Sequence, residues 1–135
     1  MLNNNLPFKI SIMNEDNSSL YIEMREINNI DCLRFSFVGK LTKEDAVDGV
    51  KYWEDIFSYI PDGEKTTIIW DCKQMTGFEN SARVEWQQAI RRLNSKIDIV
   101  WLVTNSKVIK AGAKLMSAFT SFNIKIVKRV SQISF

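Results

Sequence analysis

The side chains best suited to chemistry gather in one stretch, "TTIIWDCKQMTGFENSARVEW", residues 66–86. Asp71 follows an apolar run, and Glu79 and Ser81 come eight and ten residues later. Two carboxylates can serve as general acid and general base. Ligands of open α/β sheets collect outside the carboxyl ends of the strands, which is where Asp71 is expected. This segment is therefore the best candidate site.

A purely structural interpretation explains the same residues. Asp71 can accept hydrogen bonds from amides of the following loop, and Gly77 can supply a positive φ. Glu79 and Ser81 can complete the start of the next helix. The two interpretations place the same residues at a turn and differ only in whether that turn binds or reacts.

The absence of histidine restricts the chemistry most. A Ser-His-Asp or Cys-His nucleophile and an imidazole zinc site are excluded. The patterns GxGxxG, GxxxxGK[ST], GxSxG and CxxC are absent as well. We therefore expect no enzyme activity, no catalytic residue, no metal site and no cofactor.

The aromatic residues suggest a second kind of site. Several fall on the buried periodicity of the expected strands and helices, so an apolar pocket between sheet and helices is one interpretation and ordinary core packing is the other. The candidate pocket residues are Trp70, Trp86, Trp101 and Phe119.

Charge is unevenly distributed along the chain. Residues 1–67 carry 7 Lys/Arg and 12 Asp/Glu, whereas residues 68–135 carry 11 and 4. Lys107, Lys110 and Lys114 form a basic stripe that can meet acidic lipid or a nucleic-acid backbone. Because the basic residues are scattered, an ordinary solvated surface explains them too, and no nucleic-acid partner is expected.

Hydrophobic periodicity predicts the secondary structure. Alternating residues indicate strands at 20–27 and 32–38 and a last strand near 123–130. Short apolar runs predict buried strands at 66–70 and 98–104. Helices are expected after Thr42, over 81–94 and after Ser106 or Asn105, the last with an inward face of Val108, Gly112, Leu115, Phe119 and Phe122.

The resulting order, β-β-α-β-α-β-α-β, predicts an α/β fold with a mixed, mainly parallel central sheet and three main helices. Residues 20–135 are expected to form a single domain, and residues 1–19 a loose segment in which Phe8, Ile10 and Ile12 alternate like an extra strand. No signal peptide or membrane span is recognisable, so a cytoplasmic protein with reduced cysteines is expected. Edge strands and an exposed Phe78 make a homodimer reasonable.

Two segments, "FSFVGKLTKEDA" and "IIWDCKQMTGFENSARVEW", resemble the STAS domain superfamily in its SpoIIAA-like branch. The resemblance covers about Leu20 to Val130. It implies a mixed sheet with helices packed on it, no catalytic activity, and a role in protein interaction. Anti-sigma-factor antagonists of this superfamily bind a partner kinase and are switched by phosphorylation of a serine at a helix start.

The resemblance assigns that serine to Ser81. Aligned without gaps, Asp71 matches the Asp after the strand, and Glu79-Asn80-Ser81-Ala82 stands where the antagonists have Asp-Ser-Ser-Gly. Gly77-Phe78 matches a Gly-aromatic pair typical of the SpoIIAA-like branch, which also resembles lipid-transfer domains of the CRAL-TRIO type. A regulatory module with its recognition surface at residues 71–82 is the first hypothesis, and a carrier of a lipophilic molecule is the alternative.

Overall fold

The computed structural model describes residues 9–13, 19–27, 30–118 and 120–134. Six strands and three α-helices follow one another, with two short 3-10 turns, η1 and η2. The elements are β1 (Lys9–Met13), β2 (Ser19–Ile27), β3 (Ile30–Leu41), α1 (Lys43–Phe57), β4 (Thr66–Phe78), α2 (Asn80–Leu93), η1 (Asn94–Lys96), β5 (Ile97–Val103), α3 (Lys107–Met116), β6 (Asn123–Val127) and η2 (Val130–Gln132). The predicted order of strands and helices is confirmed, with β1 as the additional strand.

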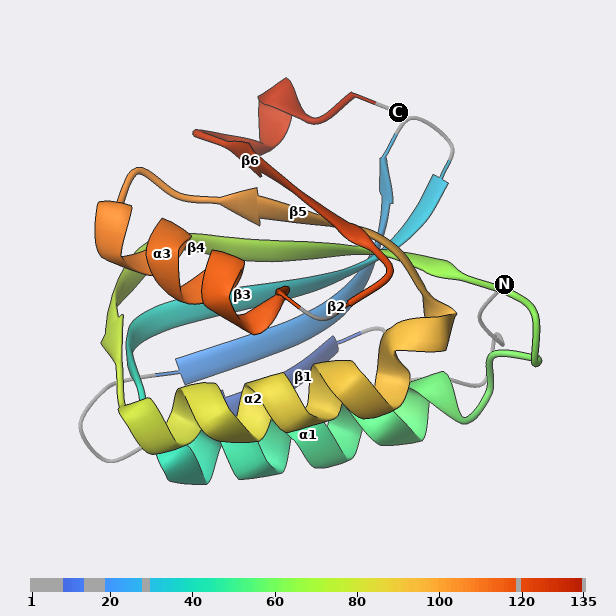
Figure 1. Cartoon of the computed structure of the whole chain (residues 1–135), viewed down its shortest axis with the longest axis horizontal. Coiled ribbons are helices and arrows are strands. Elements are labelled where there is room, and N and C mark those ends of the chain that lie inside the picture. Colours follow the sequence, from blue (N-terminus) through green and yellow to red (C-terminus); the bar gives the residue numbers. More distant parts are fainter. Residues whose placement is uncertain (1–8, 14–18, 28–29, 119, 135) are drawn as a thin grey trace.

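The sheet is mixed, and its strand order β1-β2-β3-β4-β5-β6 follows the chain. β1, β2 and β3 pair antiparallel, whereas β3, β4, β5 and β6 pair parallel. Each crossover between parallel strands is expected to be right-handed, and all three proceed in the same direction across the sheet. They therefore place α1, α2 and α3 on one face (Figure 1).

The helix-covered face holds the main core. Trp53 of α1 and Trp86 of α2 lie with ring centroids 5.2 Å apart, and both make edge-on contacts with Phe35 of β3. Gly49 permits this packing, because a Cβ at that position would lie 2.6 Å from Leu20 Cδ2 and 3.3 Å from Trp86 Cζ3. α1 and α2 thus run side by side close to the sheet.

The opposite face carries a smaller cluster. Cys32, Ile69, Trp101 and Val103 pack there beneath Ile133, which follows η2. Because adjacent residues of a strand point to opposite faces, Trp101 belongs to this cluster whereas Leu102 belongs to the main core.

Two predicted helix caps are confirmed. The Thr42 side chain accepts a hydrogen bond from Asp45 N (3.2 Å), and the Ser106 side chain accepts one from Ile109 N (3.2 Å). Within the described ranges, no helix combines the length and apolar character that crossing a bilayer requires.

The predicted inward face of α3 is wrong in part. Val108 and Leu115 are 68% and 56% exposed, whereas Ile109, Gly112 and Ala113 are buried. Phe122 is buried as predicted. Phe119 lies outside the described residues.

Candidate functional site

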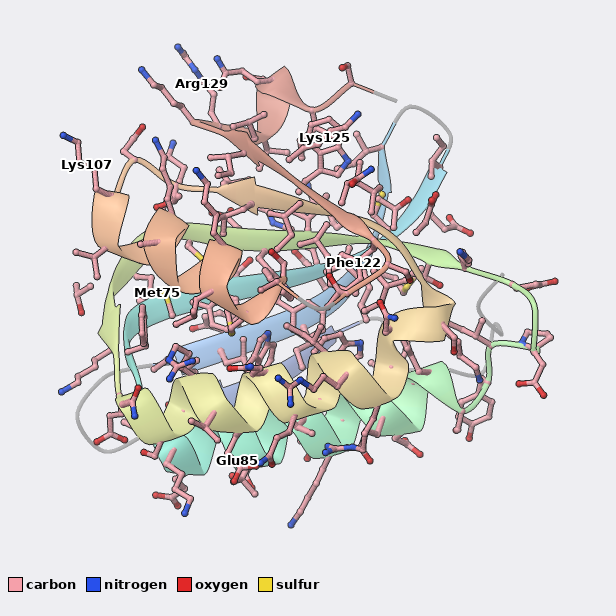
Figure 2. The ribbon with its side chains drawn as sticks, in the orientation of Figure 1. Met75, Glu85, Lys107, Phe122, Lys125 and Arg129 are labelled. Carbon is pink, nitrogen blue, oxygen red and sulfur yellow. The ribbon has the colours of Figure 1, made fainter. Side chains whose placement is uncertain are left out.

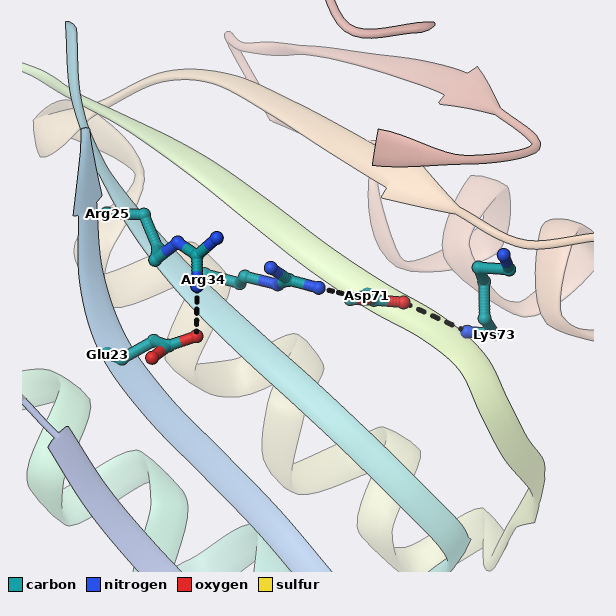
Figure 3. Close-up of polar contacts among 5 residues, drawn as sticks. All are labelled: Glu23, Arg25, Arg34, Asp71 and Lys73. Carbon is teal, nitrogen blue, oxygen red and sulfur yellow. Dashed lines mark hydrogen bonds and ion pairs between the residues drawn. The ribbon is translucent and has the colours of Figure 1, made fainter. Parts of the chain in front are cut away.

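Asp71 does not end its strand, contrary to the sequence prediction. β4 continues to Phe78, and Asp71 pairs in register with Ser36 of β3 and Val103 of β5. Its side chain lies on the sheet face opposite the helices, where one carboxylate oxygen forms an ion pair with the Arg34 guanidinium (Figure 3). The Glu23–Arg25 pair of β2 lies beside it on the same face.

The other carboxylate oxygen of Asp71 shapes the strand. Asp71 Oδ1 accepts a hydrogen bond from Lys73 N at 3.2 Å. Directly after Asp71 the register with β3 shifts, since Ser36 pairs with Asp71 but Val38 pairs with Gln74. A second shift follows between the pairs Gly39–Met75 and Lys40–Gly77. Each shift inserts one extra residue into β4, which is a β-bulge.

The two bulges decide which side chains of β4 face the helices. Strict alternation would turn Cys72, Gln74 and Thr76 to the same face. Instead Cys72, Met75 and Phe78, spaced by three, pack against the main core, while Gln74 and Thr76 are exposed. Gly77 pairs with Lys40 within the strand, and the positive-φ glycines of the described residues are Gly39 and Gly63. The expected positive φ at Gly77 is therefore wrong.

Glu79 caps a helix other than its own. Its Oε1 accepts a hydrogen bond from Lys43 N (2.7 Å), at the first residue of α1, and its backbone N donates to Leu41 O (2.9 Å). Glu79 is also the N-cap residue of α2 but makes no side-chain cap there. The junctions β3–α1 and β4–α2 are thus joined directly.

Asp71 and Glu79 do not form a catalytic pair in this geometry. Asp71 pairs with Ser36 of β3, and Phe78, which directly precedes Glu79, pairs with Leu41. The two positions of β4 therefore lie five β3 residues apart along the strand direction. At about 3.3 Å per residue this puts the two carboxyl groups roughly 15–20 Å apart. Such a distance is too large for both to act on one bond.

The remaining residues of the predicted loop lie at the start of α2. Asn80 Oδ1 accepts hydrogen bonds from Arg83 Nε (3.2 Å) and from one terminal nitrogen of Arg83 (3.0 Å). Ser81 is exposed on the first turn, and that turn contains no acidic residue. Phe78 is half-buried rather than exposed, and its ring lies against Gly112 of α3.

An apolar cavity lies beside this segment, between the sheet and helices α2 and α3. Its open interior is about 40 Å³, and the space reaches about 430 Å³ when the open mouth is included. The wall consists of Phe37 and Leu41 from β3; Trp70, Cys72, Met75 and Phe78 from β4; Arg83 and Trp86 from α2; Leu102 from β5; and Ile109, Gly112, Ala113 and Met116 from α3. In Figure 2 Met75 lies between α3 and the start of α2.

The structure brings together only part of the predicted apolar pocket. Trp70 and Trp86 line the cavity. Trp101 does not, because it points to the other face of the sheet, where Lys125 Nζ lies 5.2 Å from the centroid of its ring. Sequence reasoning missed Met75, Arg83 and Ala113, although the spacing of three in Cys72-x-x-Met75-x-x-Phe78 is a signal that strict alternation is broken.

Cys72 forms part of the wall as a neutral thiol. Burial raises the pKa of this thiol far above its usual range, and the neighbouring Asp71 carboxylate raises it further. A thiol with a raised pKa is a poor nucleophile, because the thiolate is the reactive form. Among the described residues, no group of three or more Cys, Asp or Glu side chains is placed to hold a metal ion.

Arg83 is the one charged residue among the described residues that line the cavity. Its guanidinium donates to Asn80 Oδ1 and to Gln87 Oε1 (3.0 Å), both of which are neutral amide oxygens. The other side-chain donors in the lining are the Trp70 and Trp86 indole N–H groups and the Cys72 thiol. The arrangement is an almost wholly apolar slot with Arg83 as the one charged residue of its lining.

No protein-family model matches the sequence, and no curated protein matches it. Among solved structures, the chain is similar to an uncharacterized protein from the DUF3478 family with a SpoIIAA-like fold, from Shewanella loihica PV-4. The two share 17% sequence identity with a TM-score of 0.73, over 88% of this chain and 94% of the other. With its mixed sheet and its three helices on one face, the chain has the SpoIIAA-like fold that the sequence resemblance implied.

Proposed function

We propose that this protein is a non-enzymatic binding module that holds a small apolar molecule in the cavity between β4, α2 and α3. The observation that carries the proposal is the composition of the cavity wall, in which Arg83 is the one charged side chain. Apolar pockets with few polar groups are the usual form of small-molecule sites. The recognition surface is the mouth of this cavity, where β4 ends and α2 begins.

The interior of the cavity has space for only a few water molecules, so a ligand must widen it. Met75 on β4 and Met116 on α3 are both partly exposed and line opposite walls. Methionine side chains are unbranched and adapt to irregular shapes at little cost. Rotation of these two side chains opens the cavity toward its mouth without moving the sheet.

Isothermal titration calorimetry with 1-hexanol, 1-heptanol, 1-octanol and 1-decanol tests the proposal. We expect the affinity to rise about fourfold for each added CH₂ until the cavity is filled. Ala113→Phe fills the cavity from α3 and should abolish binding. Ala111→Phe, on the exposed side of the same helix, is the matched control and should bind like the wild type. Absence of binding for every alcohol would refute an apolar ligand site.

A second candidate function is a phosphorylation switch at Ser81, and it is favoured by the exposed first turn of α2. This turn lacks an acidic residue and a side-chain cap, while the nearby Glu79 carboxylate is engaged with α1. A phosphate at this helix start would add a negative charge where the helix dipole favours one. The phosphate would therefore alter the partner surface and leave the fold intact.

The switch predicts that Ser81→Asp folds normally and changes the proteins retained in a pull-down, relative to Ser81→Ala. If both variants retain the same partners as the wild type, Ser81 is not a switch. The homodimer and the cytoplasmic location stay predictions from the sequence alone.

A further inference from the structure

We propose that the molecule held in the cavity is a small amphiphile with one anionic oxygen-based head group, such as a carboxylate, which Arg83 binds at the mouth. This inference rests on the apolar ligand site proposed above. It adds the chemical class of the ligand and names the residue that selects it.

The hydrogen bonds of Arg83 leave part of its guanidinium available. Nε and one terminal nitrogen donate to Asn80 Oδ1, and the other terminal nitrogen donates to Gln87 Oε1. These bonds use three of the five N–H groups of a guanidinium, so one N–H remains on each terminal nitrogen. Two N–H groups on adjacent nitrogens match the two oxygens of a carboxylate.

The amide partners orient Arg83 without neutralising it. In the described part of the chain, no carboxylate lies within ion-pair distance of its guanidinium. Glu79, four residues earlier, uses Oε1 to accept from Lys43 N at the start of α1. A positive charge held by neutral groups beside an apolar wall attracts an anion more strongly than the same charge in open water.

The surroundings reinforce the preference for an anion. Arg83 lies on the first turn of α2, where a cation is disfavoured by the helix dipole and an anion is favoured. The opposite wall, α3, contains Lys107, Lys110 and Lys114 and no acidic residue. An amine head group would meet repulsion from both helices.

The side-chain chemistry of the wall also argues against a ligand that only donates hydrogen bonds. No side chain of the lining is acidic or offers a strong hydrogen-bond acceptor. A head group that accepts hydrogen bonds therefore suits the lining better than one that only donates them. The small interior space favours a free single-chain molecule over a two-chain lipid.

Calorimetry with octanoate, 1-octanol and octylamine at pH 7 compares three head groups on one chain length. We expect octanoate to bind about tenfold to a hundredfold more tightly than 1-octanol, and octylamine more weakly than 1-octanol. Arg83→Gln should remove the preference for octanoate, so that octanoate and 1-octanol bind this variant with similar affinities. Arg83→Lys should retain part of the preference, since it keeps the charge without the paired N–H groups.

Arg91→Gln is the matched control, because it removes the same charge from the same helix away from the cavity wall. It should leave the ratio of octanoate to octanol affinity unchanged. Octyl phosphate should bind in an Arg83-dependent manner as well. Sedimentation with phosphatidylglycerol vesicles, with and without Arg83→Gln, tests the other source of the same head-group chemistry.

The outcomes separate this inference from the function on which it rests. Equal affinities for octanoate and 1-octanol, unchanged in Arg83→Gln, would overturn the anionic head group and leave the apolar site intact. Failure of both ligands to bind would overturn both proposals. Arg83-dependent sedimentation with vesicles, without binding of free octanoate, would overturn the small amphiphile in favour of a lipid surface.

Discussion

The charged side chains of the candidate segment are held by partners from neighbouring elements. Asp71 joins β4 to β3 through Arg34, and Glu79 joins the start of α2 to the start of α1. Both carboxylates make contacts that hold neighbouring elements together, one an ion pair and the other a hydrogen bond. We therefore expect their removal to lower the free energy of unfolding. Arg83 differs, because its partners are neutral amides and its charge stays available.

Asp71→Asn tests the ion pair on the open face of the sheet. The Arg34 and Asp71 side chains are only 18% and 14% exposed, so the substitution leaves a poorly solvated guanidinium without its counter-charge. We expect the free energy of unfolding in urea to fall by about 1–3 kcal/mol. Arg92→Gln, which breaks the more exposed pair with Glu54, is the control and should cost about 0.5 kcal/mol or less. Equal losses for the two variants would contradict the structural role of Asp71.

The raised pKa of the Cys32 thiol predicts that the stability of the protein depends on pH. Burial, aided by the Asp31 carboxylate, raises the pKa of its thiol from 9.0 to about 11 in the folded protein. The unfolded chain therefore ionises this thiol first as the pH rises above 9.0, and the free energy of unfolding falls between pH 9 and 11.

The contribution of Cys32 is obtained by difference, because tyrosine and lysine residues titrate in the same range. Urea denaturation at pH 8, 9, 10 and 11 should show that the wild type loses about 2 kcal/mol more than Cys32→Ala over this range. Parallel pH profiles for the two proteins would show that the folded state does not hold the Cys32 thiol neutral.

Among the elements, β4 and α3 differ most from the sequence prediction, and each difference has a physical reason. The apolar run 66–70 predicts a strand, but its continuation to Phe78 depends on two bulges that only the register with β3 reveals. For α3 the sequence contains two apolar stripes one residue apart. The predicted stripe contains Val108, Gly112 and Leu115, whereas the buried stripe shares Gly112 but contains Ile109 and Ala113 in place of Val108 and Leu115.

The small residues of α3 face inward because the Phe78 ring occupies the space in front of them. A Cβ on Gly112 would lie 2.8 Å from Phe78 Cζ and 3.2 Å from Cε1. Helix propensity alone makes Gly→Ala favourable by about 1 kcal/mol. Here the added methyl group must displace an aromatic ring or the helix itself.

Gly112→Ala is therefore expected to lower the free energy of unfolding, by about 1–2 kcal/mol, rather than to raise it. Phe78→Leu should relieve the contact, so the double variant should be more stable than the sum of the two single effects implies. Chemical denaturation of the four proteins gives this coupling. A stabilising Gly112→Ala in the wild-type background would show that Phe78 does not pack against α3.

At the scale of the whole molecule, the sheet has one face covered by three helices and one face without helices that is partly polar and partly apolar. The open face carries the Glu23–Arg25 and Arg34–Asp71 pairs toward β2 and an apolar cluster toward β5 and β6. Alternation in β5 predicts that Trp101 and Leu102 face opposite ways, but not which of them faces the helices. That assignment depends on the handedness of all the crossovers together, which explains why the sequence alone does not show that Trp101 faces away from the cavity.

Ile133 helps to shield the face of the sheet that carries no helices from solvent. It is 5% exposed and packs with Cys32, Ile69 and Trp101 on the face that lacks helices. Ile133→Asp places a carboxylate in this cluster and should lower the free energy of unfolding by about 2–4 kcal/mol. It should also increase the rate at which Cys32 reacts with a thiol reagent, because the segment that shields this side chain is displaced.

Ser134→Asp adds the same charge at an exposed position one residue later and should change neither the free energy of unfolding nor the rate at which Cys32 reacts. If Cys32 reacts at the same slow rate in both variants, the sheet itself shields the thiol, and the C-terminal segment contributes nothing to closing this face.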